Sequence, residues 1–170
     1  YDVADHAGNN AVQVTRKVIV EEAAPADNYA AWVAGSGLAG LAADQQALDA
    51  DPDGDGLANL AEYALGLDPA TNGAHSLTAD TTGGTLSITF VRLKAATDAT
   101  VSYKVELATT LKDWSAANAT IKGALEGVNQ DDLPDGKPYA SSAYERVTAT
   151  ANTDMAGSGG KQFLRLSIEK

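Results

Sequence analysis

Apolar residues alternate with polar residues along several stretches of the second half of the chain, and this spacing limits what the chain can fold into. The pattern covers Leu86 to Phe90, Val101 to Leu107, Tyr144 to Ala151 and Phe163 to Ile168. Successive side chains of a strand point to opposite faces, so a period of two predicts strands with one buried face. Gly- and Asp-rich connections separate these strands. We therefore predict a mainly β chain with an antiparallel β-sandwich or small barrel at residues 76–170.

Residues 23–75 show helical spacing instead. Asp27 can cap a brief helix that Gly35 ends, and residues 42–50 are expected to form one or two helical turns. An i, i+3, i+4, i+7 spacing predicts a second, amphipathic helix, which stops at Gly66. Its apolar positions are Leu57, Leu60, Ala61, Ala64 and Leu65.

Residues 1–22 predict a β-hairpin. A turn at residues 6–10 follows Tyr1 and Val3, and it precedes a strand whose valines are Val12, Val14, Val18 and Val20. An isolated hairpin is marginally stable in water, so its apolar face needs a cover. Two covers are open: the rest of this chain, or a neighbouring chain or domain that residues 1–20 join by strand addition. Because the sequence starts with Tyr1 rather than Met, we expect a mature or excised fragment.

Charge and composition exclude several classes of partner. The 12 Lys and Arg residues face 23 Asp and Glu residues, a formal net charge of −11 that repels nucleic acid phosphates. No apolar stretch approaches the roughly 20 residues of a membrane span, so membrane insertion is not expected. The absence of cysteine excludes disulfides and thiolate metal sites. Cations are the ligands that this chain favours.

The segment from Asp51 to Glu62 carries the clearest chemical pattern. It places carboxylates at its first, third, fifth and twelfth positions, a polar residue at its ninth, and Gly56 where the chain must turn sharply. Calcium prefers six to eight hard oxygen ligands, and a twelve-residue loop supplies them at this spacing, with a backbone carbonyl at the seventh position. The predicted cofactor is therefore Ca²⁺, and its predicted ligands are Asp51, Asp53, Asp55, Leu57, Asn59 and Glu62.

Two other interpretations of this segment are less favoured. A solvated Asp-Gly turn before a helix explains the aspartates and glycines together, but it does not explain Asn59 and Glu62 at their spacing. Magnesium is a weaker alternative because its octahedral shell does not need a bidentate twelfth acid. A single unpaired loop is expected to bind calcium at about 10⁻⁴ to 10⁻³ M, which suits a structural role in constant high calcium.

Three parts of the chain resemble known families. The loop Asp-Pro-Asp-Gly-Asp-Gly-Leu-Ala-Asn-Leu-Ala-Glu resembles the calcium loops of dockerins and thrombospondin type 3 repeats, although Ala58 is smaller than the usual residue and no second loop is found. Residues 1–22 resemble the last two strands of bacterial immunoglobulin-like repeats. Residues 76–170 resemble β modules of unassigned function that follow such loops. The resemblance implies the C-terminal region of a secreted multidomain bacterial protein.

An enzymatic function is not predicted. His6 and His75 have no evident acid or nucleophile partner. Three glutamates could in principle pair as the carboxylates of a glycosidase: Glu106, Glu126 and Glu145. In a chain with so many acids, such a pairing carries little information. These residues are interpreted as ordinary surface or strand-edge groups.

The predicted function is a calcium-stabilised structural or assembly module of a secreted or cell-surface bacterial protein. One alternative is a carbohydrate-binding accessory domain of an extracellular hydrolase, whose sugar-stacking residues would be Trp114, Tyr103, Tyr139 and Tyr144. Another is a filament or adhesin subunit that assembles by strand addition through residues 1–20.

Overall fold

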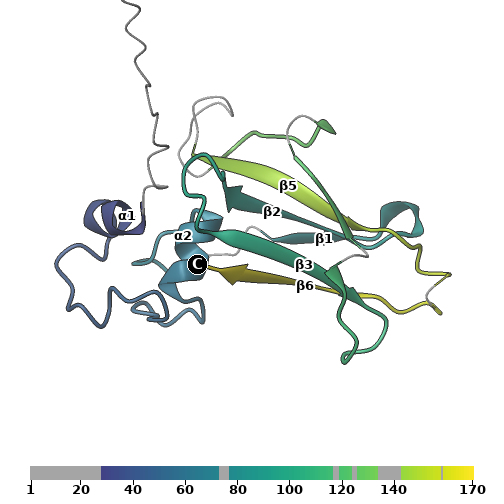
Figure 1. Ribbon diagram of the computed structural model, residues 1–170, viewed down its shortest axis with the longest axis horizontal. Coiled ribbons are helices and arrows are strands. Elements are labelled where there is room, and N and C mark those ends of the chain that lie inside the picture. Colours follow the sequence, from purple (N-terminus) through teal and green to yellow (C-terminus); the bar gives the residue numbers. More distant parts are fainter. Residues whose placement is uncertain (1–27, 73–76, 117–118, 124–125, 134–142, 158) are drawn as a thin grey trace, which may run out of the picture.

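The chain is mainly β and antiparallel, as the sequence predicts. The computed structural model describes residues 28–72, 77–116, 119–123, 126–133, 143–157 and 159–170, so the hairpin predicted at residues 1–22 lies outside the described residues. Within the described residues, two short helices precede the strands (Figure 1). The elements are α1 (Tyr29–Gly35), α2 (Asn59–Leu65), β1 (Thr78–Asp80), a 3₁₀ turn (Thr82–Gly84), β2 (Ser87–Leu93), β3 (Ser102–Ala108), β4 (Ala119–Lys122), β5 (Tyr144–Ala151) and β6 (Phe163–Glu169).

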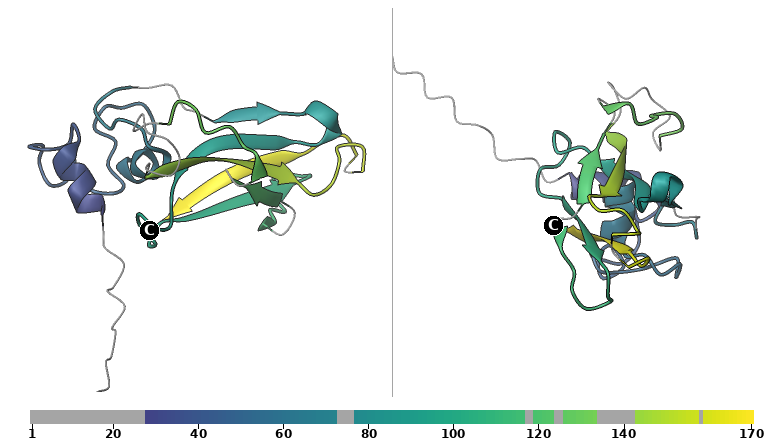
Figure 2. Two further views of the ribbon diagram at one scale, coloured as in Figure 1. Left: turned by 90° about the horizontal axis from the view of Figure 1, so that it is seen from above. Right: turned by 90° about the vertical axis from the view of Figure 1, so that its right-hand side faces the viewer.

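The strands form two antiparallel sheets. One sheet has the order β1-β2-β5-β4, and the other pairs β3 with β6. In the register of the larger sheet Phe90 lies opposite Val147 and Ile88 lies opposite Ala149, so one face is apolar. These four residues form a buried cluster with Val105 of β3, to which both sheets contribute. The views of Figures 1 and 2 show the two sheets packed along the length of their strands.

Helix α2 belongs to the same core as the strands. Its Tyr63 and Ala64 are buried in a second apolar cluster with β2 and with the start of β5. The hydroxyl of Tyr103 donates to the Ala64 carbonyl at 2.6 Å, and the hydroxyl of Tyr144 donates to the Tyr63 carbonyl at 3.0 Å. Helix α2 and the strands therefore share one core.

The helical segment differs in detail from its predicted form. The second helix starts at Asn59 rather than Leu57 and ends, as expected, at Gly66, which adopts a left-handed φ of 71°. Residues 42–50 form hydrogen-bonded turns without a helix. The N-cap position of α1 is Asn28, whose side chain makes no capping bond and donates instead to the Thr97 carbonyl. No helix among the described residues is long and apolar enough to cross a membrane.

Gly37 shows how closely the helical segment packs. A Cβ atom at Gly37 would lie 2.2 Å from the Cβ of Ala70, whereas a Cβ at Gly35 would have no neighbour within 4 Å. We expect Gly37→Ala to lower the free energy of unfolding by about 1–3 kcal/mol through overpacking. Gly35→Ala is the matched control, with no loss expected because α1 gains a better helix former. Urea unfolding measures both, and equal effects of the two variants would contradict this packing.

Candidate metal centre

The acidic segment folds into a tight loop whose ends are tied together. Gly54 and Gly56 have φ values of 75° and 93°, a left-handed conformation that glycine adopts without a steric penalty. The N–H of Asn59 donates to the Ala50 carbonyl at 2.8 Å, and the N–H of Leu60 donates to the Leu48 carbonyl at 2.9 Å. These two bonds hold the start and the end of the loop next to each other, so the side chains between them lie close together.

Three aspartates converge inside this loop. One carboxylate oxygen each from Asp51, Asp53 and Asp55 lies within 4.8 Å of the other two. Backbone N–H groups hold each carboxylate in place. Those of Gly54 and Gly56 donate to Asp51 at 2.9 and 3.0 Å, that of Asp55 donates to Asp53 at 3.2 Å, and that of Leu57 donates to Asp55 at 2.8 Å. The loop thus orients three like charges toward one another.

Glu62 is a fourth carboxylate, contributed by α2. It does not belong to the 4.8 Å aspartate cluster, and its residue is only 1% exposed. Burial raises the pKa of the Glu62 carboxyl to about 7, and the negative charges of Asp53, Asp55 and Asp51 add to the effect. Because the side chain is buried beside the three acids, its ionised form needs a cation.

Unpartnered buried oxygens concentrate at this loop. Among the described residues, four buried side-chain polar atoms have no hydrogen-bond partner: Asp53 Oδ2, Asn59 Oδ1, Glu62 Oε2 and Gln162 Oε1. Three of the four belong to predicted calcium ligands. Each such group costs about 1–3 kcal/mol when left unsatisfied, so native structures supply a protein group, a water or an ion.

Asn59 and Leu57 take part in the loop in different ways. The side-chain amide of Asn59, fully buried, donates to the carbonyls of Gln45 and Ala47 at 2.9 and 2.7 Å. These two bonds fix which end of the amide is nitrogen, and they brace the segment before the loop. Leu57 closes the turn through its N–H. The roles of the Asn59 side chain and the Leu57 carbonyl as ligands stay predictions.

The donor set consists of oxygens. Four carboxylates, an amide and a backbone carbonyl are the ligands that hard divalent cations prefer, and thiolates and imidazoles are absent from this loop. No protein-family model, curated protein or solved structure matches this chain. The loop's own residues fit a hard divalent cation in donor type, in charge and in the buried oxygens that lack a hydrogen-bond partner.

The other acids considered from the sequence are engaged in structural contacts. Glu106, 5% exposed, accepts from Arg165 Nε at 2.6 Å, and this bond holds the pKa of its carboxyl below the ordinary range. Glu145 pairs with Arg92 at 2.8 Å. Glu126 accepts from the Gly123 N–H at 2.8 Å. His6 and His75 lie outside the described residues.

The aromatic residues considered for sugar stacking are dispersed. Tyr103 and Tyr144 use their hydroxyls to bind carbonyls of α2, and Tyr144 is only 9% exposed. Trp114 is half-buried, with the guanidinium carbon of Arg165 4.5 Å from the centre of its ring. Tyr139 lies outside the described residues. Carbohydrate binding stays a prediction; Trp114 and Tyr103 are both half-buried, and Tyr144 is buried.

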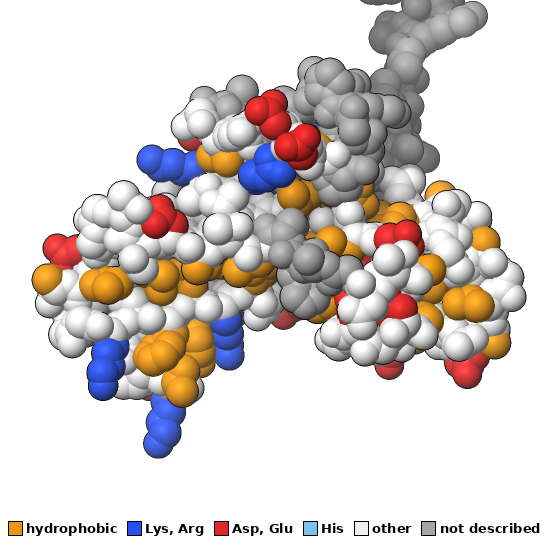
Figure 3. All heavy atoms as spheres, turned by 180° about the vertical axis from the view of Figure 1, so that it is seen from behind, with side chains coloured by type: hydrophobic (Ala, Val, Ile, Leu, Met, Phe, Trp, Pro, Cys, Tyr) orange, Lys and Arg blue, Asp and Glu red, His pale blue; other side chains and the backbone are white. Residues whose placement is uncertain are grey.

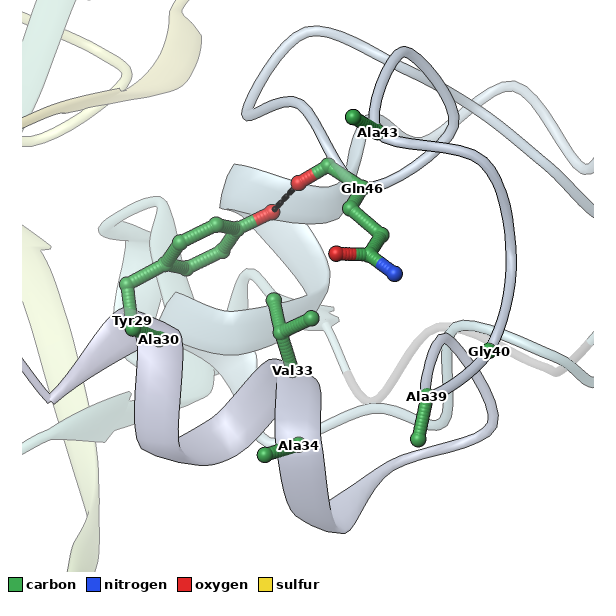
Figure 4. Close-up of a pocket in the computed structure, with 8 residues that line it drawn as sticks. All are labelled: Tyr29, Ala30, Val33, Ala34, Ala39, Gly40, Ala43 and Gln46. Atoms are coloured by element: carbon green, nitrogen blue, oxygen red, sulfur yellow. Dashed lines mark hydrogen bonds between the residues drawn. The ribbon is translucent and has the colours of Figure 1, made fainter.

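A hollow of about 570 Å³ lies between α1 and the turns that follow it (Figure 4). Its walls are mainly alanines, Gly40 and Val33. The Tyr29 hydroxyl donates to the Gln46 carbonyl at 3.0 Å, and the Gln46 side chain donates to the carbonyls of Leu38 and Leu41. The polar groups of the hollow therefore hold the protein's own backbone.

One buried cluster beside α2 is not evident from the sequence. Asp98, 2% exposed, accepts from the Tyr63 hydroxyl at 2.9 Å and from Lys170 Nζ at 3.0 Å, and it also accepts from the Thr100 N–H at 2.9 Å. Tyr63 directly follows Glu62. Asp98 therefore links Tyr63, the residue after the acidic loop at residues 51–62, to Lys170, the residue after β6.

Proposed function

We propose that this chain is a calcium-stabilised structural module of a secreted or cell-surface bacterial protein, with a β-sandwich stiffened by the loop at residues 51–62. The observation that carries the proposal is the Glu62 carboxylate, buried and unpartnered at Oε2 beside three aspartates. A secreted bacterial setting is supported by the loop's resemblance to extracellular calcium loops.

Calcium would be held by the carboxylates of Asp51, Asp53, Asp55 and Glu62, with the Leu57 carbonyl and Asn59 completing the oxygen shell. The ion would offset the repulsion among four acids and provide a partner for oxygens that lack one. Its contribution is charge neutralisation and ligand organisation, not catalysis. Magnesium, which is smaller, keeps more of its water and demands near-octahedral geometry, fits this set of protein ligands less well.

The loop is placed to transmit this stabilisation to the β core. Glu62 lies in the first turn of α2, and the adjacent Tyr63 is buried against the strands. A cation that fixes Glu62 therefore also fixes the helix on which Tyr63 and Ala64 reach the core. The module as a whole, rather than the loop alone, should respond to calcium.

Thermal unfolding with calcium, with magnesium and with chelator tests the proposal. A ligand present at 100 times its dissociation constant adds about 2.7 kcal/mol, which in a domain of this size raises Tm by about 5–10 °C. We expect a rise of this order with calcium and a much smaller one with magnesium. An unchanged Tm in calcium would show that the loop does not stabilise the fold through this ion.

The matched control separates the loop from general acidity. An Asp51→Ala, Glu62→Ala double variant should lose the calcium-dependent rise in Tm. Asp44→Asn removes an exposed acid a few residues before the loop and should keep the full rise. A similar loss in both variants would mean that the response comes from diffuse charge screening and not from this site.

A further inference from the structure

Strand β6 has an open edge beside an apolar groove. Among the residues that the structure describes, β6 pairs with β3 on one side and with no strand on the other. A hollow of about 360 Å³ flanks it, and the loop segment and helix α2 form its other wall. The groove is lined by Leu48, Asp49, Ala58, Leu60, Ala61, Leu166 and Ile168.

This edge has the two properties of a strand acceptor. Its unpaired backbone groups can extend the sheet, and the neighbouring hollow can receive alternate side chains of an added strand. Leu60, Leu166 and Ile168 are only half-buried, so part of their apolar surface remains in water. Figure 3 shows, from behind, hydrophobic side chains in a band across the β part of the molecule. A strand added to β6 would remove the exposed part of Leu60, Leu166 and Ile168 from solvent.

We propose that residues 11–20 of the same chain add to the free edge of β6 and place their valines in this groove. Four valines share one parity in this segment: Val12, Val14, Val18 and Val20. A period of two puts them on one face of an added strand, as Leu166 and Ile168 share one face of β6. The segment therefore carries the side-chain spacing that the groove can accept.

The connection between the two is long enough. Asn28 donates to the Thr97 carbonyl, and the next residue, Asp98, binds Lys170 at the end of β6. The start of α1 thus lies near the C-terminal end of β6. Eight residue steps separate Val20 from Asn28 and span up to about 26 Å when extended. A strand of seven residues is about 20 Å long, so the linker reaches along the whole edge.

Charge favours this occupant as well. Residues 11–20 carry Arg16 and Lys17 and no acid, in a chain whose net charge is −11. Arg16 has the parity of the valines, so it would lie at the centre of the face that enters the groove. Asp49 is the charged residue among those that line the groove. An Arg16–Asp49 pair would neutralise both groups there.

Cross-linking on the full chain tests the proposal, and the absence of native cysteine makes introduced thiols specific. Thr15→Cys and Ser167→Cys have the parity opposite to the valines and to Leu166, so both leave the groove intact. A short bifunctional maleimide should join them within one chain. The comparison pair, Thr15→Cys with Lys122→Cys, tests whether the segment lies beside β4, which is an edge of the other sheet. This pair should give little cross-linked product.

Three charge reversals provide the specificity control. Arg16→Glu should reduce the yield of the cross-link between the thiols of Thr15→Cys and Ser167→Cys several-fold, and adding Asp49→Arg should restore it. Lys17→Glu makes the same change in net charge on the opposite face and should leave the yield unchanged. Equal losses for Arg16→Glu and Lys17→Glu would overturn the assignment of faces. Cross-linked dimers, preferential linkage to the thiol of Lys122→Cys, or no linkage to that of Ser167→Cys would overturn the proposal itself.

Discussion

Replacement of Glu62 by glutamine is expected to stabilise the metal-free protein and to abolish its response to calcium. The folded-state pKa of Glu62 is about 7, raised from 4.5 by burial and by Asp53, Asp55 and Asp51. A group whose pKa is raised by folding stabilises the fold below its unfolded pKa, and this contribution is lost as pH rises through the folded value. At pH 8 the cost in the metal-free protein is about 3 kcal/mol, and glutamine does not incur it.

Urea unfolding at pH 5 and pH 8, in chelator and in calcium, measures both effects. In chelator, the parent should lose more stability between pH 5 and pH 8 than Glu62→Gln does. In calcium at pH 8, the order should reverse, because the ion stabilises the parent alone. Asp44→Asn serves as the control for removal of an exposed charge. A glutamine variant less stable than the parent in chelator at pH 8 would contradict the unfavourable burial of the Glu62 charge.

Asp98→Ala is expected to lower the free energy of unfolding by about 3–5 kcal/mol, because it removes the carboxylate that pairs with a buried ammonium group. The Asp98 side chain is fully buried and the Lys170 side chain is 8% exposed. Burial acts to raise the pKa of Asp98, but hydrogen bonds from Thr100, Lys170 and Tyr63 outweigh it and hold the pKa well below its ordinary value. The stabilisation is therefore present above about pH 4 and is lost as pH falls further.

A double-mutant cycle with Lys170→Met isolates the ion pair. Removing both charges should cost clearly less than the sum of the two single variants, since neither then leaves an unpaired buried charge. Lys104→Met is the comparison, because Lys104 pairs with Glu106 at 3.3 Å but its side chain is 56% exposed. Glu106 keeps its ion pair with Arg165 when Lys104 is removed, so Lys104→Met should cost about 1 kcal/mol or less. Additive losses for Asp98 and Lys170 would show that the pair is not coupled.

Much of the fold follows from the periodicity of the sequence. Strands β2, β3, β5 and β6 lie where apolar residues alternate, because each has one face in the core. The sequence pattern did not predict strands β1 and β4. They are three and four residues long, too short for a periodic signal, and they lie at the edges of their sheet; β1 is exposed throughout, and only Ala119 and Ile121 of β4 pack against the core.

The geometry of the acidic loop at residues 51–62 was predictable in part. The spacing of its acids predicts the convergence of Asp51, Asp53 and Asp55, because these residues are close in sequence. The two hydrogen bonds of the Asn59 amide depend on residues 42–50, whose path has no periodic signal. Asp98 and Lys170 are 72 residues apart, so nothing local in the sequence links them.

The Tyr63 ring of α2 contacts two aromatic rings of α1. The ring of Tyr63 lies 5.3 Å from that of Trp32 and 5.4 Å from that of Tyr29, centre to centre, and Tyr63 is the residue after Glu62. A shift of α2 would change the surroundings of the Trp32 indole, whose emission depends on its environment. With Trp114 replaced by phenylalanine, Trp32 becomes the single tryptophan of the chain. The emission of Trp32 then reports on Tyr63, the residue that follows Glu62.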